Sequence, residues 1–496
     1  MTAGLQLPSR RALPGRRPLG SATRLLAAVG LAAGVLGAGG CASSGDGDVA
    51  ASPRTAWVPP AAAVPAPEAA PAAGPGRPLD LVALTDIALE HNQGTRLAWL
   101  AAKSAAAQRL QAGSAWLPQV SVGFSRQEQA LGSIPGLPPG LAAGGSRSIT
   151  YGPTYSINQL IYDFGGTQGN LAAARAALFA ADFSYNQTLQ DTMLAVQVDY
   201  YQTIAADSAL QAAQVALQDA KTGLDLAATR RKVGLAAPGD QLRAESNLRS
   251  AEFQVEQQTA ALEQSRAALA QVLGIAITPD FTLAPPPSTP PAPELARDVA
   301  SITREAIARR PDLLAAVATL QARAEALRAA RSGYLPSLST SLSGQRQYLH
   351  GAPGNPSDNW TFSLNLNWSI FDGLNTQSRI DAARAQLDSA RQAVLQQEVA
   401  IVADVWTQYY SLQSAAKQVD SARAALDAAN EALQVVEQGY RSGLNPLTDL
   451  LGAQKDLAAA RQQKIQADTG LAVALARMAH VTGALEAPPP GAAPAP

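Results

Sequence analysis

Residues 360–370 read Trp-Thr-Phe-Ser-Leu-Asn-Leu-Asn-Trp-Ser-Ile, an alternation of large apolar and small polar side chains. Successive side chains of a β-strand point to opposite faces of a sheet, so this stretch predicts a strand with one apolar face and one polar, uncharged face. A half-buried sheet over a soluble core would show the same alternation. A lipid-facing strand is favoured because Trp360 and Trp368 bracket the apolar positions, as aromatic girdles bracket the apolar band of membrane strands.

The strand belongs to a unit that occurs twice in the chain. Ile-Tyr-Asp at 161–163, with Thr-Gln four residues on, returns as Ile-Phe-Asp at 370–372 with Thr-Gln, an offset of 209 residues. Ahead of this motif, Trp-Leu-Pro at 116–118 matches Tyr-Leu-Pro at 334–336 with an offset of 218, because the first copy has a longer Gly- and Pro-rich loop. The chain therefore contains tandem repeats.

The repeats span about 79–278 and 295–485, with a Pro-rich linker at 279–294 and a disordered tail at 486–496. Each reads helix, strand, loop, strand, long helix, turn, helix. The expected hairpins cover about 118–163 and 336–372, and the expected long helices about 170–233 and 379–442.

Each long helix would extend about 95 Å at ~1.5 Å per residue. Large residues recur every seven positions, and alanine follows many of them three positions later. This heptad pattern predicts closely packed, supercoiled helices. In the second copy the large positions are Val405, Leu412, Val419, Leu426, Leu433 and Tyr440.

The N-terminus has the pattern of an export signal. Residues 1–24 contain five arginines and no acidic residue. An uncharged run at 25–40 follows and ends in small residues before Cys41. This predicts a signal peptide at 1–40 and, by resemblance to a bacterial lipobox, a lipidated Cys41 that begins an Ala- and Pro-rich segment at 41–78. An ordinary signal peptide with an incidental Cys41 is the alternative.

Composition excludes several classes of protein. The 496 residues are 47% hydrophobic and carry a net charge of −1, which argues against a basic nucleic-acid binder. With one cysteine and three histidines, His91, His350 and His480, there is no metal-ligand cluster, disulfide framework or Cys/His nucleophile pair. We expect solvated or helix-capping roles for the histidines, and neither a cofactor nor enzymatic activity.

Strand counting requires an oligomer if the hairpins cross a membrane. The chain supplies four strands, whereas bacterial membrane barrels begin at about eight. Two or three chains would suffice.

These features together resemble the TolC-like outer membrane efflux protein family, in its NodT-type lipoprotein subgroup. The resemblance rests on the duplicated unit, the Leu-Pro entries to both hairpins, Tyr440-x-x-Gly443 followed by Asp449-Leu450-Leu451, and Arg309-Arg310-Pro311-Asp312 after the linker. It implies a mainly α fold with a small β part and a homotrimer. Three chains would form a 12-stranded outer-membrane β-barrel continued by a long periplasmic α-helical barrel.

The resemblance also implies a passive exit duct of a tripartite efflux system for drugs or other small toxic compounds. The duct would be lipid-anchored in the bacterial outer membrane, contact its lipid, extend into the periplasm, and work with a periplasmic adaptor and an inner-membrane pump. The turns at Gly234, Leu235, Gly443 and Leu444 would contact the adaptor. Asp240 and Asp449, with Tyr440, would form the periplasmic constriction.

Alternatives remain open for these residues. Each Asp could simply cap its helix, and Tyr440 could be packing alone. Asn445 stands where a basic residue can hold the closed tip in the family, so nearby cations are candidates for substitute ion pairs: Arg230, Arg231, Lys232, Arg243 and Arg441.

Two further functions fit the same architecture. One is the outlet of a protein secretion system, and the other is a structural coiled-coil lipoprotein that tethers the outer membrane. The lipobox and the Arg-Arg-Pro-Asp segment favour efflux.

Overall fold

The computed structural model describes residues 79–131, 146–276, 282–285, 297–350 and 356–484. Cys41, the expected signal peptide, the Ala- and Pro-rich segment and the expected C-terminal tail lie outside these ranges.

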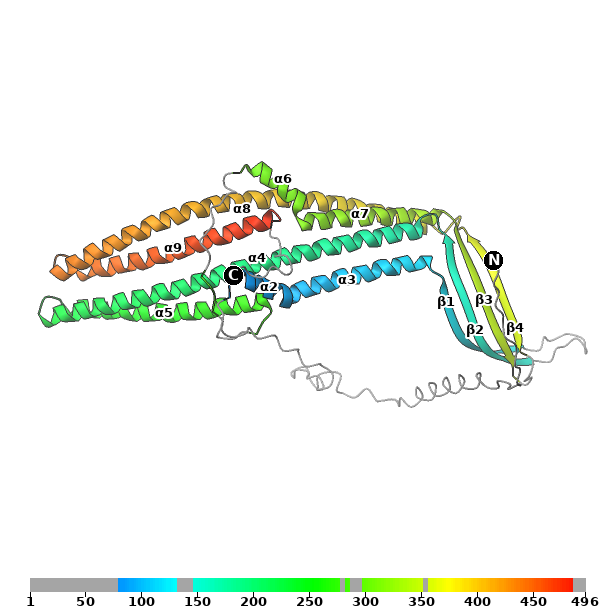
Figure 1. The fold of residues 1–496 in the computed structure, drawn as a ribbon, viewed down its shortest axis with the longest axis horizontal. Helices are drawn as coiled ribbons and strands as arrows, with labels where there is room; N and C mark the ends of the chain where they lie inside the picture. Colours follow the sequence, from blue (N-terminus) through cyan, green and yellow to red (C-terminus); the bar gives the residue numbers. More distant parts are fainter. Residues whose placement is uncertain (1–78, 132–145, 277–281, 286–296, 351–355, 485–496) are drawn as a thin grey trace, which may run out of the picture. The chain divides into compact units, whose positions relative to one another are not determined.

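The strands form one antiparallel sheet in the order β1 (Gln119–Leu131), β2 (Ser146–Tyr162), β3 (Ser337–Leu349) and β4 (Ser357–Asn367) (Figure 1). The two hairpins have equivalent registers. Gln119 pairs with Asn158 in the first, and the residues at the repeat offsets, Ser337 and Asn367, pair in the second. The hairpins join through β2 and β3, which leaves β1 and β4 at the edges.

The expected strand through Ile370 is too long at its C-terminal end, because β4 stops at Asn367. Trp368 leaves the ladder, and its indole Nε1 donates a hydrogen bond to the Tyr334 carbonyl at 3.0 Å. Trp360 lies within β4 and is exposed.

The repeated Asp-x-x-x-Thr motif turns each strand into a long helix. The Asp163 carboxylate accepts hydrogen bonds from the backbone and side chain of Thr167, and Asp372 does the same with Thr376. The two residues after each Asp have positive φ, with Phe164 at 53° and Leu374 at 69° among them. The capping carboxylates let the helices begin several residues before the expected positions.

The long helices are α4 (Gly166–Lys232) and α8 (Asn375–Ser442), about 100 Å each at ~1.5 Å per residue. The chain returns along them in α5 (Pro238–Leu273) and α9 (Leu447–Val481). Shorter helices precede the hairpins, and brief 3₁₀ turns at 114–116 and 332–334 lead into them. The short helices are α2 (Leu81–His91), α3 (Gln93–Gly113), α6 (Val299–Arg309) and α7 (Pro311–Arg331).

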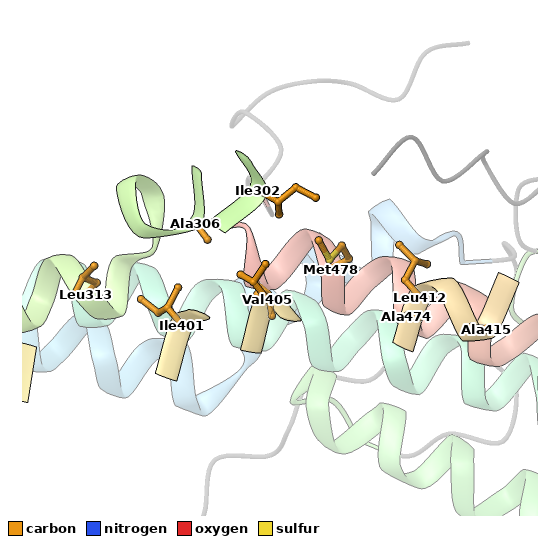
Figure 2. Close-up of a cluster of buried hydrophobic side chains, with 10 residues drawn as sticks. Ile302, Ala306, Leu313, Ile401, Val405, Leu412, Ala415, Ala474 and Met478 are labelled. Atoms are coloured by element: carbon orange, nitrogen blue, oxygen red, sulfur yellow. The ribbon is translucent and has the colours of Figure 1, made fainter. Parts of the chain in front are cut away.

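The two repeats have different neighbours within the chain. Helix α4 packs against α3 and α5 of its own repeat and against α7 and α9 of the second repeat, whereas α8 packs against α6, α7 and α9. The core consists of narrow seams along these contacts. In the seam drawn in Figure 2, Ile401, Val405 and Leu412 of α8 are fully buried with Met478 of α9.

The first repeat has its own seam, which includes part of the expected linker. Tyr200 of α4 is buried, its hydroxyl donates to the Ala284 carbonyl at 2.8 Å, and burial raises its pKa to about 12. Leu79 pairs with Leu283 in a parallel bridge. Residues 282–285 are thus attached to the first repeat.

Among the helices that the structure describes, none combines the length and apolarity needed to cross a membrane.

Candidate functional site

The two helix-to-helix turns share one backbone geometry. Gly234 after α4 and Gly443 after α8 adopt φ of 76° and 85°, and each is followed by a leucine whose amide donates back to the last helical turn. Leu235 donates to the Arg230 carbonyl and Leu444 to the Gly439 carbonyl, both at 2.8 Å. This is the Schellman closure of a helix C-terminus, for which a left-handed glycine is favoured. It leaves Leu235 and Leu444 exposed, Leu444 to 83%.

Behind the turns, the two helical hairpins pack together. One cluster of buried residues contains one alanine from each of α4 and α5 and larger side chains from α8 and α9. Its members are Ala227, Ala244, Tyr440, Leu447 and Leu450. The seven-residue spacing that predicted seam positions therefore continues to the end of α8. Packing of Tyr440, one of the two expected roles, is thus observed, with 3% of the residue exposed.

Arg230 connects the repeats at this end. Its guanidinium donates to the Tyr440 carbonyl, and its Cζ lies 4.7 Å from the centre of the Tyr440 ring. The first contact satisfies a carbonyl at the negative end of the α8 dipole, and the second is a cation–π interaction. We call Arg230 and Tyr440 the tip clasp. Sequence reasoning placed Arg230 among possible ion-pairing residues, but its observed partners are a carbonyl and a ring.

Two of the other cations expected near the turns, Arg231 and Arg441, have local partners. Arg231 donates to Gln241 at 2.6 Å, which links α4 to α5, and Arg441 pairs with Glu437 one turn earlier on α8. These contacts stay within one repeat, whereas the tip clasp spans two.

The environment of Tyr440 connects the clasp to Asp240. Burial raises the pKa of the Tyr440 hydroxyl, the nearby Arg230 opposes this, and the charge of Asp240 adds to it. The hydroxyl is buried and makes no hydrogen bond within the part of the chain that the structure describes. A change in the charge of Arg230 or of Asp240 would therefore shift the pKa of the Tyr440 hydroxyl.

Asp240 and Asp449 occupy equivalent positions, three residues into α5 and α9, but make different contacts. The Asp240 carboxylate accepts a hydrogen bond from the Ala237 amide at 3.3 Å, which satisfies a free helix-start donor. At the second turn Pro446 replaces Ala237, and proline has no amide hydrogen to donate. Asp449 is exposed and lies 3.5 Å from the Thr448 hydroxyl. The capping interpretation is thus observed for Asp240, while Asp449 retains an exposed carboxylate.

Two polar contacts outside the turns were missed from sequence. His480 of α9 was expected to be solvated or capping, yet its side chain is only 15% exposed and lies 2.8 Å from Asp191 of α4. This contact lowers the pKa of Asp191. Arg310, at the break between α6 and α7, is buried between Asp312 and Asp404 at 2.6 and 3.1 Å. Arg310 and Asp404 are 94 residues apart in the chain, and His480 and Asp191 are 289 residues apart. No local pattern in the sequence indicates these two pairs.

Comparison with known proteins gives a consistent result. The family model described as "Outer membrane efflux protein" matches residues 84–275 and 302–484. Protein CyaE of Bordetella pertussis is 30% identical over 389 residues, which cover 78% of this chain and 80% of the relative. The pyoverdine export outer membrane protein OpmQ of Pseudomonas putida is 24% identical over 78% of this chain and 82% of its own length. The Campylobacter jejuni CmeC outer membrane channel superposes with a TM-score of 0.74 at 17% identity, covering 82% of this chain and 85% of that one.

The tip clasp can be tested by removing its charge. We expect Arg230→Gln to weaken local stability of the turns by about 1–3 kcal/mol, since a charged hydrogen bond and a cation–π contact are lost. Hydrogen exchange of amides in residues 433–451 would then accelerate by roughly five- to 150-fold.

Arg231→Gln is the matched control, because it removes the same charge one residue away and leaves Tyr440 untouched. Equal exchange in the two variants would contradict a clasp that depends on Arg230.

Proposed function

Since the chain belongs to the outer membrane efflux protein family, we propose that it is the exit duct of a tripartite efflux system, through which small molecules pass passively. Members of this family are channels rather than enzymes, and the chain is an outer-membrane efflux component that extends into the periplasm. The observation that carries the proposal is the junction of a four-stranded sheet, polar on one face, with helices about 100 Å long.

A homotrimer would give α8 the neighbours that it lacks. Exposed apolar side chains run along one face of α8 at helical spacing: Leu395, Val399, Val402, Trp406 and Tyr410. Val402 is 37% exposed, whereas Met193, at the equivalent position of α4, is 3% exposed. In α4 the neighbouring helices include α7 and α9 of the other repeat. The equivalent helices for α8 are α3 and α5 of a second copy, and α3 exposes Leu97, Trp99 and Leu100.

The sheet supports the same assembly. Ile157 of β2 pairs with Leu342 of β3, and the repeat offsets convert this pair into Leu366 of β4 and Phe124 of β1 in the next copy. The transferred register places Leu366 opposite Phe124 and Trp368 opposite Val122 on the apolar face, with Leu364 opposite Arg126 farther along it. On the polar face it places Ser363 opposite Gln127. Head-to-tail contacts of this kind form a ring when the rotation closes. Three chains would give twelve strands, which is ample for a barrel.

Engineered disulfides test this register. Ser363→Cys combined with Gln127→Cys should yield covalent trimers under oxidation, because directly opposed residues come within disulfide distance. Denaturing electrophoresis without reductant measures the product.

Ser363→Cys combined with Arg126→Cys is the control, because a slip of one residue puts the two thiols on opposite faces. Crosslinking of the control pair, with none of the first pair, would contradict the transferred register. The parent chain, whose one cysteine is Cys41, reports any background.

In the trimer, we propose that Asp240 and Asp449 lie at the periplasmic constriction. Six carboxylates brought together would favour cations. Asp449 contributes an exposed carboxylate to this field, whereas Asp240 also serves as a cap.

The two roles separate by substitution. We expect Asp449→Asn to lower the cation-to-anion permeability ratio in planar bilayers by roughly twofold with little change in stability. Asp240→Asn should lower the ratio as well and also destabilise the start of α5 by about 0.5–1 kcal/mol, with thermal unfolding as the measurement. An unchanged ratio in the double variant would place both residues away from the constriction.

We further propose that the adaptor docks at Gly234, Leu235, Gly443 and Leu444. The exposed leucines at the ends of the hairpins support this, because exposed apolar side chains at a helical end suit a protein partner. The matching geometry of the two turns would present equivalent surfaces around the ring.

In-cell photo-crosslinking from Leu444, followed by mass spectrometry, tests the function. Capture of a periplasmic adaptor is expected, and the pump associated with that adaptor would separate small-molecule efflux from protein secretion. A reactive residue at Phe253, exposed on α5 away from the turn, is the control. Capture of peptidoglycan-associated proteins alone from Leu444 would favour a tether.

A further inference from the structure

Charged residues of the strands share the face of the apolar side chains. In β1, Arg126 and Glu128 continue the alternation of Val120, Val122 and Phe124. In the second hairpin, Arg346 is opposite Asp358, and the same face carries Leu342 opposite Phe362. The other face of these two strand pairs is built from Ser, Thr, Asn, Gln and Gly at the paired positions from Ser121 to Gln129 and from Ser341 to Gln347. Charge has therefore been placed on the apolar face, where it is least expected.

These charges lie at the end of the sheet remote from the helices. β1 begins after α3 and runs away from the helices to Leu131, so Arg126 comes after the apolar positions in that direction. β4 runs the opposite way, and Asp358 precedes its apolar positions. Arg126 and Arg346 are both exposed. Aromatic residues mark the boundary: Tyr151, paired with Arg126, stacks on Tyr348 with ring centres 5.6 Å apart, and Trp360 is exposed in β4.

The spacing sets the depth of the arginines. Arg126 is two residues beyond Phe124, or ~7 Å along the strand. The polar layer of a bilayer is about 5–7 Å thick on each side of the hydrocarbon. With Phe124 in hydrocarbon, as the proposed duct requires, the long side chain of Arg126 can extend its guanidinium to the headgroups of the outer leaflet. Arg346 is four residues beyond Leu342 on the same face and nearer the end of its strand.

We propose that Arg126 and Arg346 bind the phosphate groups of phosphorylated glycolipids in the outer leaflet. The inference rests on the proposed membrane-spanning sheet and adds a specific lipid contact to it. A trimer would present six of these arginines around the barrel. Guanidinium groups bind phosphate through paired, charge-assisted hydrogen bonds, which suits a headgroup phosphate.

The Asp358 carboxylate opposite Arg346 does not remove this preference. Arg346 contacts Asp358 through one nitrogen at 3.4 Å, and both side chains remain more than half exposed. A pair with this geometry in an exposed position is worth little, so the guanidinium can engage a phosphate as well. Arg126 is one strand removed from the Arg346 pair, beyond β2.

Binding of diphosphoryl lipid A to the purified, delipidated full-length trimer tests the proposal. We expect Arg126→Gln with Arg346→Gln to weaken its affinity about tenfold or more, as measured by native mass spectrometry. Arg126→Lys with Arg346→Lys should retain only part of the affinity, because lysine keeps the charge but loses the paired hydrogen bonds. Arg249→Gln with Arg328→Gln is the matched control, since it removes two exposed, ion-paired arginines from α5 and α7.

Equal affinity of the native and Gln variants would overturn the proposal, and so would equal binding of lipid A whose phosphates have been removed. Binding of phosphatidylglycerol as tightly as lipid A would overturn the assignment to outer-leaflet glycolipid. Conductance and oligomeric state are measured in parallel. A native chain that neither trimerises nor conducts contradicts the proposed duct, whereas a conducting trimer with arginine-independent lipid binding contradicts the lipid contact alone.

Discussion

The hydrogen-bonding groups along the outer edges of β1 and β4 have no strand partner within the part of the chain that the structure describes. Inside a membrane such groups cannot be left unpaired, because no water is present to satisfy them. A sheet of four strands is too narrow to close on itself, so its edges can be satisfied only by other chains. A sheet with an apolar face and open edges would therefore need neighbouring chains in a membrane. The register between β2 and β3, transferred by the repeat offsets, would pair β4 with β1 of the next chain.

The helices, like the edges of the sheet, have surfaces that the described part of the chain does not cover. Their buried residues form narrow seams, in which Val405, Leu412 and Ala415 of α8 cluster with Ala474 of α9. A helix of this length with so narrow a core is stabilised by its neighbours rather than by intrinsic propensity. Helix α4 has neighbours from both repeats, whereas α8 keeps an exposed apolar stripe. Duplication thus gives α4 its neighbours within the chain, whereas in the proposed trimer α8 would obtain them from an adjacent copy.

Periodicity was sufficient to predict the elements, and the family was predicted from the resemblance of the duplicated motifs, because both depend on short stretches of sequence. The two hairpins, the long helices and the seam positions are of this kind, and the fold class and family predicted from them are confirmed. The end of β4 was wrong because a distant carbonyl, that of Tyr334, holds Trp368 outside the ladder. The partner of His480 and the contacts of Arg230 lie 289 and 210 residues away in the chain. A single sequence contains no local signal for such pairs.

The repeats have kept a common backbone while their polar groups have diverged. Asn92 and Arg310 occupy equivalent breaks between two short helices, but Asn92 caps α3 with a neutral amide whereas Arg310 is buried between two carboxylates. Asp404, one of these carboxylates, corresponds to Ala195 in the first repeat. Asp240 and Asp449 differ in the same way. Asp240 accepts a hydrogen bond from the Ala237 amide, whereas Pro446, at the equivalent position before Asp449, has no amide hydrogen. In the proposed trimer, the duplicated backbone would place equivalent positions around a ring with an approximate sixfold repeat, and divergence of charge at those positions would reduce the repeat to threefold. Contacts with a partner of lower symmetry can then distinguish one turn from the other, although the two turns have the same shape.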